Sequence, residues 1–113
     1  MPETSDLSAT TLLQITFRVE PGSLGPQGRD HVEAFCGLAQ QALKPLDAAV
    51  MALDIVPRLD KSKPEIECHL SGKKLTQTQM DQWLQSCGYS FDQVEDYLAR
   101  EISQLIKRYR QRL

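Results

Sequence analysis

The chain has 113 residues, of which 41% are hydrophobic and 25% are charged, and its formal net charge is −2. That apolar content excludes an intrinsically disordered chain, and the length is that of one domain. A net charge so close to zero argues against a general polyanion-binding protein, because nucleic-acid-binding domains are usually basic overall or on one face. We expect a disordered lead at residues 1–9 and a single domain over residues 10–113.

The cysteines and the N-terminus favour a cytoplasmic protein. Cys36, Cys68 and Cys87 are odd in number and form no Cys-x-x-Cys pair, which is typical of a reducing compartment. Residues 1–8 are polar and acidic, unlike a signal peptide, and no apolar run approaches the roughly 20 residues of a membrane span.

The N-terminal half predicts a strand, a loop and a helix. Apolar and polar residues alternate over residues 13–20, the period of a strand with one buried face. Residues 21–28 contain two prolines and three glycines and predict a loop without regular structure. Asp30 and Glu33 form a capping box for a helix that ends near Lys44-Pro45. Apolar residues recur along that helix at helical spacing: Phe35, Leu38, Ala39, Ala42, Leu43 and Leu46.

A hairpin is predicted next. An apolar segment rich in β-formers predicts a second strand over residues 49–59, and alternation over residues 66–70 predicts a third. The turn-forming segment 60–64 between them favours antiparallel pairing of these two strands.

Two helix-start signals follow. Thr76 with Gln79, and Ser90 with Gln93, both have the spacing of a capping box. Gly88 is typical of the residue that ends a helix in the left-handed conformation. The last helix is long enough for its C-terminal end to overhang the core. It carries one apolar stripe, formed by Phe91, Val94, Leu98, Ile102, Leu105 and Tyr109.

The order strand-helix-strand-strand-helix-helix predicts an α+β fold. We expect a small, mostly antiparallel sheet packed by helices on one face. This arrangement is similar to a ferredoxin-like fold that lacks its last strand.

A DNA-binding helix-turn-helix is the strongest functional alternative for the last two helices. Gly88 lies in the turn, with Leu84 four residues before it and Val94 six residues after it. The first turns of the recognition helix would hold Asp92 and Glu95, however, whose carboxylates repel phosphates. These acidic residues instead suit the positive end of the helix dipole.

The C-terminal end is the main candidate binding site. Lys107, Arg108, Arg110 and Arg112 cluster there, and grouped cations bind acidic protein surfaces or polyanions. Cations in a last helical turn also stabilise the helix end, by about 0.3–1 kcal/mol each, which explains part of the cluster. Trp83 is a second candidate because tryptophan often anchors interfaces, although its spacing also fits a core residue.

The sequence contains no catalytic, cofactor or metal motif, so we expect neither an enzyme nor a metal-binding protein. Cys68 and His69 are neighbours in a strand and should point to opposite faces. A structural zinc site usually needs four Cys or His ligands in paired groups, which this chain does not offer. Residues 71–74, Ser-Gly-Lys-Lys, lack the glycine spacing of a P-loop and fit a strand-to-helix turn.

The segment from Leu75 to Leu98 resembles part of the parvulin-associated chaperone proteins, in that a capped short helix, Gly-Tyr-Ser and a second capped helix follow one another. The prolyl-isomerase domain of those proteins has no counterpart in this sequence, so the resemblance implies no activity.

We therefore expect a non-enzymatic interaction module, an accessory or regulatory subunit. It should dock on a larger protein complex, or on a second copy, through the long C-terminal helix and a sheet edge beside the first strand. The alternative is a nucleic-acid-binding protein that uses the basic C-terminal end and Lys73-Lys74. A small-ligand enzyme using His69 or the loop at 21–28 is a further alternative.

Overall fold

The computed structural model describes residues 12–113, and the predicted lead at 1–9 lies outside them. The elements are β1 (Leu13–Val19), the 3₁₀ helix η1 (Pro21–Leu24), α2 (Gly28–Ala42), β2 (Met51–Pro57), β3 (Ile66–Leu70), β4 (Lys73–Lys74), α3 (Gln77–Ser86) and α4 (Phe91–Gln111). The predicted α+β class and the order of the main elements are confirmed.

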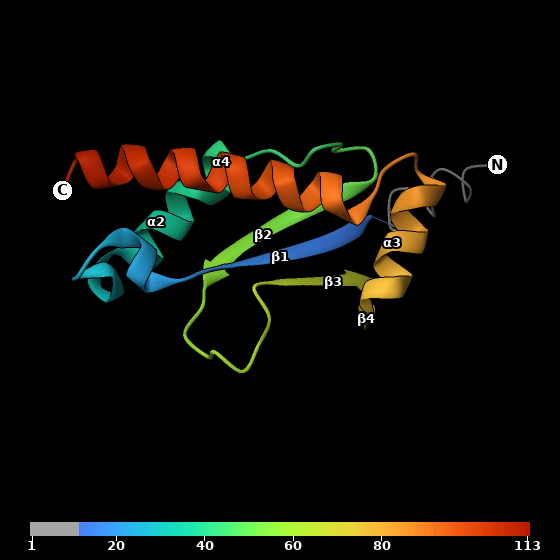
Figure 1. Ribbon diagram of the computed structural model, residues 1–113, viewed down its shortest axis with the longest axis horizontal. Helices are drawn as coiled ribbons and strands as arrows, with labels where there is room; N and C mark the ends of the chain where they lie inside the picture. The colour runs from blue at the N-terminus through green and yellow to red at the C-terminus, as the bar shows by residue number, and fades with distance from the viewer. Residues whose placement is uncertain (1–11) are drawn as a thin grey trace.

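The four strands form one mixed sheet in the order β2-β1-β3-β4 (Figure 1). β1 pairs in parallel with β2 along its whole length and antiparallel with β3. The predicted hairpin between the second and third strands is therefore wrong, because β2 and β3 lie on opposite sides of β1. The segment between them crosses the end of β1, where the Arg58 N–H donates to the Val19 carbonyl (2.8 Å).

The strand order also departs from the ferredoxin-like arrangement. In that arrangement another strand separates the two parallel strands joined by the first helix, whereas β1 and β2 are direct neighbours here. α2 supplies the crossover that adjacent parallel strands require. The sequence period shows which face of each strand is buried, but it does not specify the neighbouring strand.

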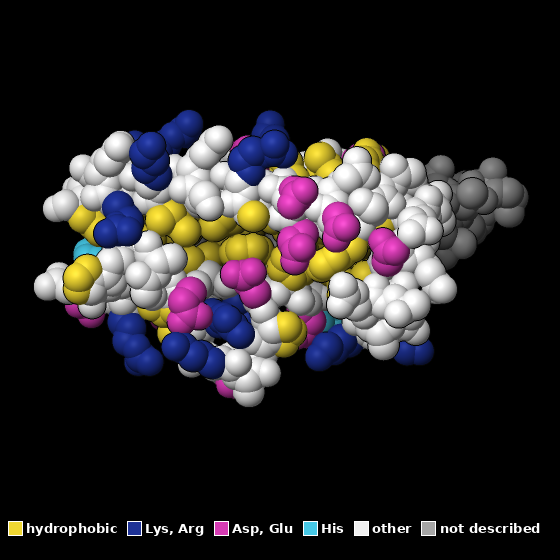
Figure 2. All heavy atoms as spheres, in the orientation of Figure 1, with side chains coloured by type: hydrophobic (Ala, Val, Ile, Leu, Met, Phe, Trp, Pro, Cys, Tyr) yellow, Lys and Arg dark blue, Asp and Glu magenta, His cyan; other side chains and the backbone are white. Residues whose placement is uncertain are grey.

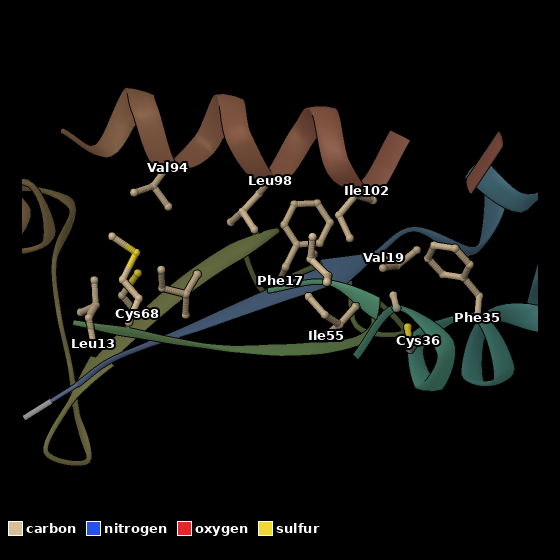
Figure 3. Close-up of a cluster of buried hydrophobic side chains, with 14 of the residues drawn as sticks. Leu13, Phe17, Val19, Phe35, Cys36, Ile55, Cys68, Val94, Leu98 and Ile102 are labelled. Atoms are coloured by element: carbon tan, nitrogen blue, oxygen red, sulfur yellow. The ribbon is translucent and has the colours of Figure 1, made fainter. Parts of the chain in front are cut away.

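The helices α2 and α4 cover one face of the sheet (Figure 1). Three residues of the predicted stripe, Val94, Leu98 and Ile102, are buried and point from α4 towards the sheet (Figure 3). The other side of this core is formed by alternate strand residues, among them Leu13, Ile15, Phe17, Val19, Ile55 and Cys68. This burial accounts for the alternation along β1.

The C-terminal end of α4 extends past the sheet, as its length suggested, and packs against α2 there (Figure 1). The Tyr109 ring meets the Phe35 ring edge-on, with centroids 5.5 Å apart, and lies 6.2 Å from the His31 ring. α2 therefore supports the turns of α4 that extend past the sheet.

Both late capping boxes are confirmed. Thr76 and Ser90 accept hydrogen bonds from the backbone of Gln79 and Gln93, whose side chains bond back to the cap residues. Gly88 has a φ of 88°, in the left-handed region as predicted.

The predicted start of the first helix is wrong. α2 begins at Gly28 after Gln27, whose side chain makes no capping bond, so Asp30 lies inside the first turn rather than before it. The preceding segment is not a plain loop either, because Pro21 opens a 3₁₀ helix. Proline suits a first helical position, where an N–H would have no partner.

The segment after β3 forms a tight hairpin rather than the predicted strand-to-helix turn. Ser71 (φ 52°) and Gly72 (φ 80°) both adopt positive φ, the combination that a two-residue type I′ hairpin requires. The chain therefore folds back, and Lys73-Lys74 pair with β3 as a short edge strand.

Candidate functional site on helix α4

The candidate binding residues lie at two ends of the molecule. Arg108, Arg110 and Lys107 are in the last turns of α4, and Arg112 caps it, whereas Trp83 is on α3, which lies at the opposite end (Figure 1). The 21 residues of α4 span about 30 Å. The tail and Trp83 therefore belong to different surfaces.

Lys73-Lys74 are also remote from the basic tail, because β4 lies at the α3 end (Figure 1). Lys74 is within 3.9 Å of the Glu67 carboxylate, which offsets its charge. The two basic segments of the nucleic-acid alternative do not meet in one patch.

A groove of about 340 Å³ lies between α2 and the C-terminal end of α4. Two of the candidate residues, Arg108 and Arg112, line it, and they are one helical turn apart. Its full lining is Phe35, Leu38, Ala39, Gln41, Ala42, Leu105, Arg108, Tyr109 and Arg112.

The groove combines apolar surface with positive charge. Leu38 is 49% exposed although it belongs to the apolar pattern of its helix, and the buried Phe35 and Ala39 lie beside it. Within residues 12–113, neither Arg108 nor Arg112 has a carboxylate within 4.0 Å. Sequence reasoning identified the arginines but not Leu38, because its exposure depends on how α2 sits against α4.

The predicted free sheet edge beside the first strand is absent from the described sheet, because β1 is central. β2, which neighbours β1, is an edge strand of the sheet. The side chain of Gln40 from α2 lies against the middle of the free edge of β2. Its side-chain amide donates to the Leu53 carbonyl (2.9 Å) and accepts from the Ile55 N–H (2.7 Å), as a neighbouring strand would. Such cover is a known protection of edge strands against pairing with other chains.

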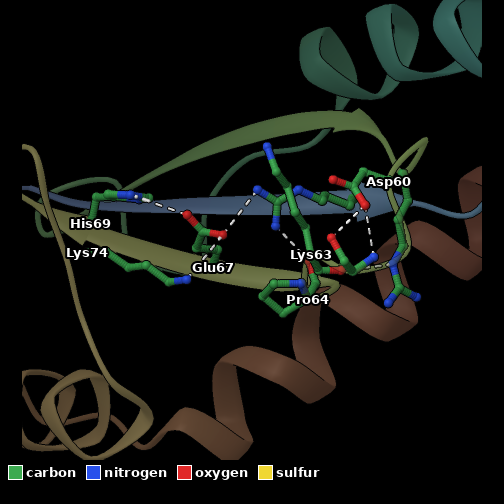
Figure 4. Close-up of polar contacts among 9 residues, drawn as sticks. Asp60, Lys63, Pro64, Glu67, His69 and Lys74 are labelled. Carbon is green, nitrogen blue, oxygen red and sulfur yellow. Dashed lines mark hydrogen bonds and ion pairs between the residues drawn. The ribbon is translucent and has the colours of Figure 1, made fainter.

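The face of the sheet opposite α2 and α4 carries an ion-pair cluster centred on Glu67 (Figure 4). Its carboxylate lies 3.1 Å from Arg18, 3.3 Å from the His69 imidazole and 3.9 Å from Lys74. Burial raises the pKa of Glu67, but the hydrogen bond and the charge of Arg18 outweigh it, so the net shift is downward. Arg18 also donates to the Pro64 carbonyl (2.7 Å) and so ties the segment after β2 to the sheet.

The ion pairs of this cluster hold β1, β3 and the segment before β3 together. His69 points to the open face and Cys68 to the core, as predicted, so the two do not act together. Near the loop at 21–28, Arg58 and Lys61 are likewise paired with Glu20, at 3.5 and 3.4 Å. In both places the charged side chains are paired with one another.

The thiols of Cys36 and Cys68 are buried in the core. Burial, with a smaller contribution from Glu33, raises the pKa of Cys36 to about 11. Burial, with a smaller contribution from Glu67, raises the pKa of Cys68 to about 12. Both thiols therefore stay protonated and unreactive at neutral pH, since the thiolate is the reactive form.

In the native protein at about pH 8, we expect an alkylating reagent to label only the partly exposed Cys87. Because an unfolded thiol ionises near pH 9, the unfolded chain loses protons there that the native chain keeps. The free energy of unfolding should therefore fall from about pH 9 towards pH 11–12, and should fall less in a Cys36→Ala/Cys68→Ala variant. Mass spectrometry of labelled peptides and denaturant titrations measure both effects. Equal labelling of Cys68 and Cys87 would contradict this burial.

Residues 12–113 contain no group of three His, Cys, Asp or Glu side chains placed to hold a metal ion. None of the helices in that range has the length and apolar character of a membrane span. Comparison with family models, with curated proteins and with solved structures found no match to this chain. The resemblance at residues 75–98 thus gains no support from these comparisons.

Proposed function

We propose that this protein is a non-enzymatic interaction module, an accessory or regulatory subunit that docks on a larger protein through the α2–α4 groove. The observation that carries the proposal is that one groove combines the exposed Leu38 with two arginines whose charges no described carboxylate neutralises. A helix dipole alone explains cations at a helix end, but it does not explain an exposed leucine beside them.

The groove fits a partner segment with an apolar side chain and nearby carboxylates. The apolar side chain would lie on Leu38 and Tyr109, and the carboxylates would pair with Arg108 and Arg112. Amphipathic helices bind grooves between helices in this way, with apolar anchors at helical spacing. Arginine and aromatic residues are also the side chains most often found to dominate binding free energy. We place the interaction in the cytoplasm, where the three free cysteines would stay reduced.

An Arg108→Gln/Arg112→Gln variant tests this proposal. It keeps the length of α4 and should stay folded, but it should weaken partner binding by about 1–3 kcal/mol for each arginine that the partner desolvates. Capture from the native extract with quantitative mass spectrometry should show proteins that wild type retains and this variant loses. The affinity of each such protein, once purified, is then measured by titration.

The matched control is Arg100→Gln/Lys107→Gln, which removes the same charge from the side of the same helix that faces solvent. Equal loss in both double variants would make the effect one of net charge and would contradict docking in the groove. Binding of wild type to nucleic acid, with an affinity that falls steeply with salt and is lost in both variants, would favour the nucleic-acid alternative.

A further inference from the structure

The flank of α4 that faces away from α2 carries a second ordered pattern. Its members recur every three or four residues and fall within a sector of about 80° on the helix. They are Asp92, Glu95, Ala99, Ser103, Ile106 and Arg110. We call these six residues the outer flank.

The outer flank changes chemistry along its length. Its start is acidic at Asp92 and Glu95, its middle is small or apolar, and its end is basic at Arg110. All six are exposed except Ile106, which is half-buried. Figure 2 shows acidic side chains towards the start of α4, Lys and Arg towards its end, and an apolar band below it.

The middle of the outer flank borders a hollow of about 180 Å³, whose lining is mostly apolar but includes Glu20 and Glu65. Phe17 and Val19 of the core form part of its floor, and Ala99, Ser103 and Ile106 form one wall. A second hollow shares Ser103 and Ile106 and extends to Arg110. Small side chains at two of these positions leave room for another helix to approach closely.

We propose that two copies of this protein associate through the outer flank, with their α4 helices antiparallel. The midpoint between Glu95 and Arg110 and the midpoint between Ala99 and Ile106 coincide, between residues 102 and 103. A two-fold axis at that point places Glu95 opposite Arg110 of the second copy, and Ala99 opposite its Ile106. Ser103 lies half a residue from the axis, so the two Ser103 side chains are close neighbours, offset by about 1.5 Å along the helices.

Self-complementary charge identifies the second copy as the partner. One surface carries both the acidic and the basic end, so an antiparallel pair makes the same ion pair twice, as an isologous two-fold interface requires. A parallel pair would place Glu95 against Glu95 and Arg110 against Arg110, which repel. The α2–α4 groove lies on the other flank of α4, so it stays open in this dimer and does not depend on it.

A cysteine at the axis tests the geometry directly. In a Cys87→Ser background, Ser103→Cys should form a disulfide-linked dimer within minutes of adding diamide, because the two new thiols would be neighbours. The control is Gln104→Cys, one residue further on and on the side of α4 that faces solvent, which should form no disulfide-linked dimer. Equal cross-linking of the two variants would overturn the proposed axis.

Charge reversal tests the ion pairs. Glu95→Arg and Arg110→Glu should each weaken self-association by about tenfold or more, because each places like charges opposite one another. An equimolar mixture of the two variants should recover the dimer, since in the mixed pair one end joins the two reversed side chains and the other joins the two native ones. Arg108→Glu, on the groove flank, should leave the dimer intact.

Analytical ultracentrifugation measures these associations, and circular dichroism verifies that every variant is folded. A wild type that remains monomeric up to about 1 mM would overturn the proposal. Failure of the mixture to recover a dimer that both single variants had lost would overturn it as well.

Discussion

Leu98→Asp is expected to abolish folding. Leu98 has no exposed surface and lies at the centre of the apolar stripe of α4, facing the sheet (Figure 3). The described core around this position consists of apolar side chains, so a carboxyl group there would lose its hydrogen bonds to water without replacement. Burying such a group costs several kcal/mol. Domains of this size are usually stable by only about 5–15 kcal/mol, so the folded state should be lost or barely populated.

Circular dichroism and thermal melting measure this loss. Ile102→Asp should behave in the same way, whereas Gln104→Asp, on the exposed face of the same helix, should change the melting temperature little. If Leu98→Asp melted like wild type, the stripe would face solvent or a partner, and the core described above would be wrong.

Gly28→Ala is expected to be the most damaging of the conservative changes. A Cβ at Gly28 would lie 1.7 Å from the carbonyl oxygen of Pro21 and 2.6 Å from its carbonyl carbon. These are backbone atoms, so relief requires movement of η1 away from α2 rather than a change of rotamer. We expect a loss of about 3 kcal/mol or more, at the upper end for overpacked positions.

Gly37→Ala is the matched control in the same helix. Gly37 is exposed, and a Cβ there meets no atom within 4 Å. Because alanine loses less backbone entropy than glycine on folding, this variant should be more stable than wild type by about 0.5–1 kcal/mol. Denaturant titrations of both variants decide the point: if their stabilities were equal, the close approach of η1 to Gly28 would be wrong.

Gly28 also changes how the loop at 21–28 is interpreted. Its two prolines and three glycines predicted a loop without regular structure, of the kind that often carries binding. The structure instead contains a 3₁₀ helix whose backbone touches the first turn of α2, and Leu24 of that helix is buried. The glycine is therefore explained by packing, and composition alone could not separate the two interpretations.

The sequence predicted the cations of the candidate site but not the groove that two of them line. The cations at the end of α4 are adjacent in the chain, so their cluster and the helix beneath them were both predictable. The groove needs Leu38 and Phe35 of α2, more than 60 residues earlier in the chain, and their relation to α4 follows from the packing of Tyr109. For the same reason the sequence could not show that Trp83 and the basic end of α4 lie on different surfaces, about the length of α4 apart.

The sequence by itself determined the local features of this protein. Capping boxes at Thr76 and Ser90, the left-handed Gly88 and the two periodicities depend on residues within a few positions of one another, so they are visible in the chain. Only the tertiary structure decided that β1 is central, that Gln40 covers the edge of β2, and that the two flanks of α4 carry different surfaces. Strand pairing and helix placement depend on which distant segments bury one another, and an alternating or helical pattern fits several such partners equally well.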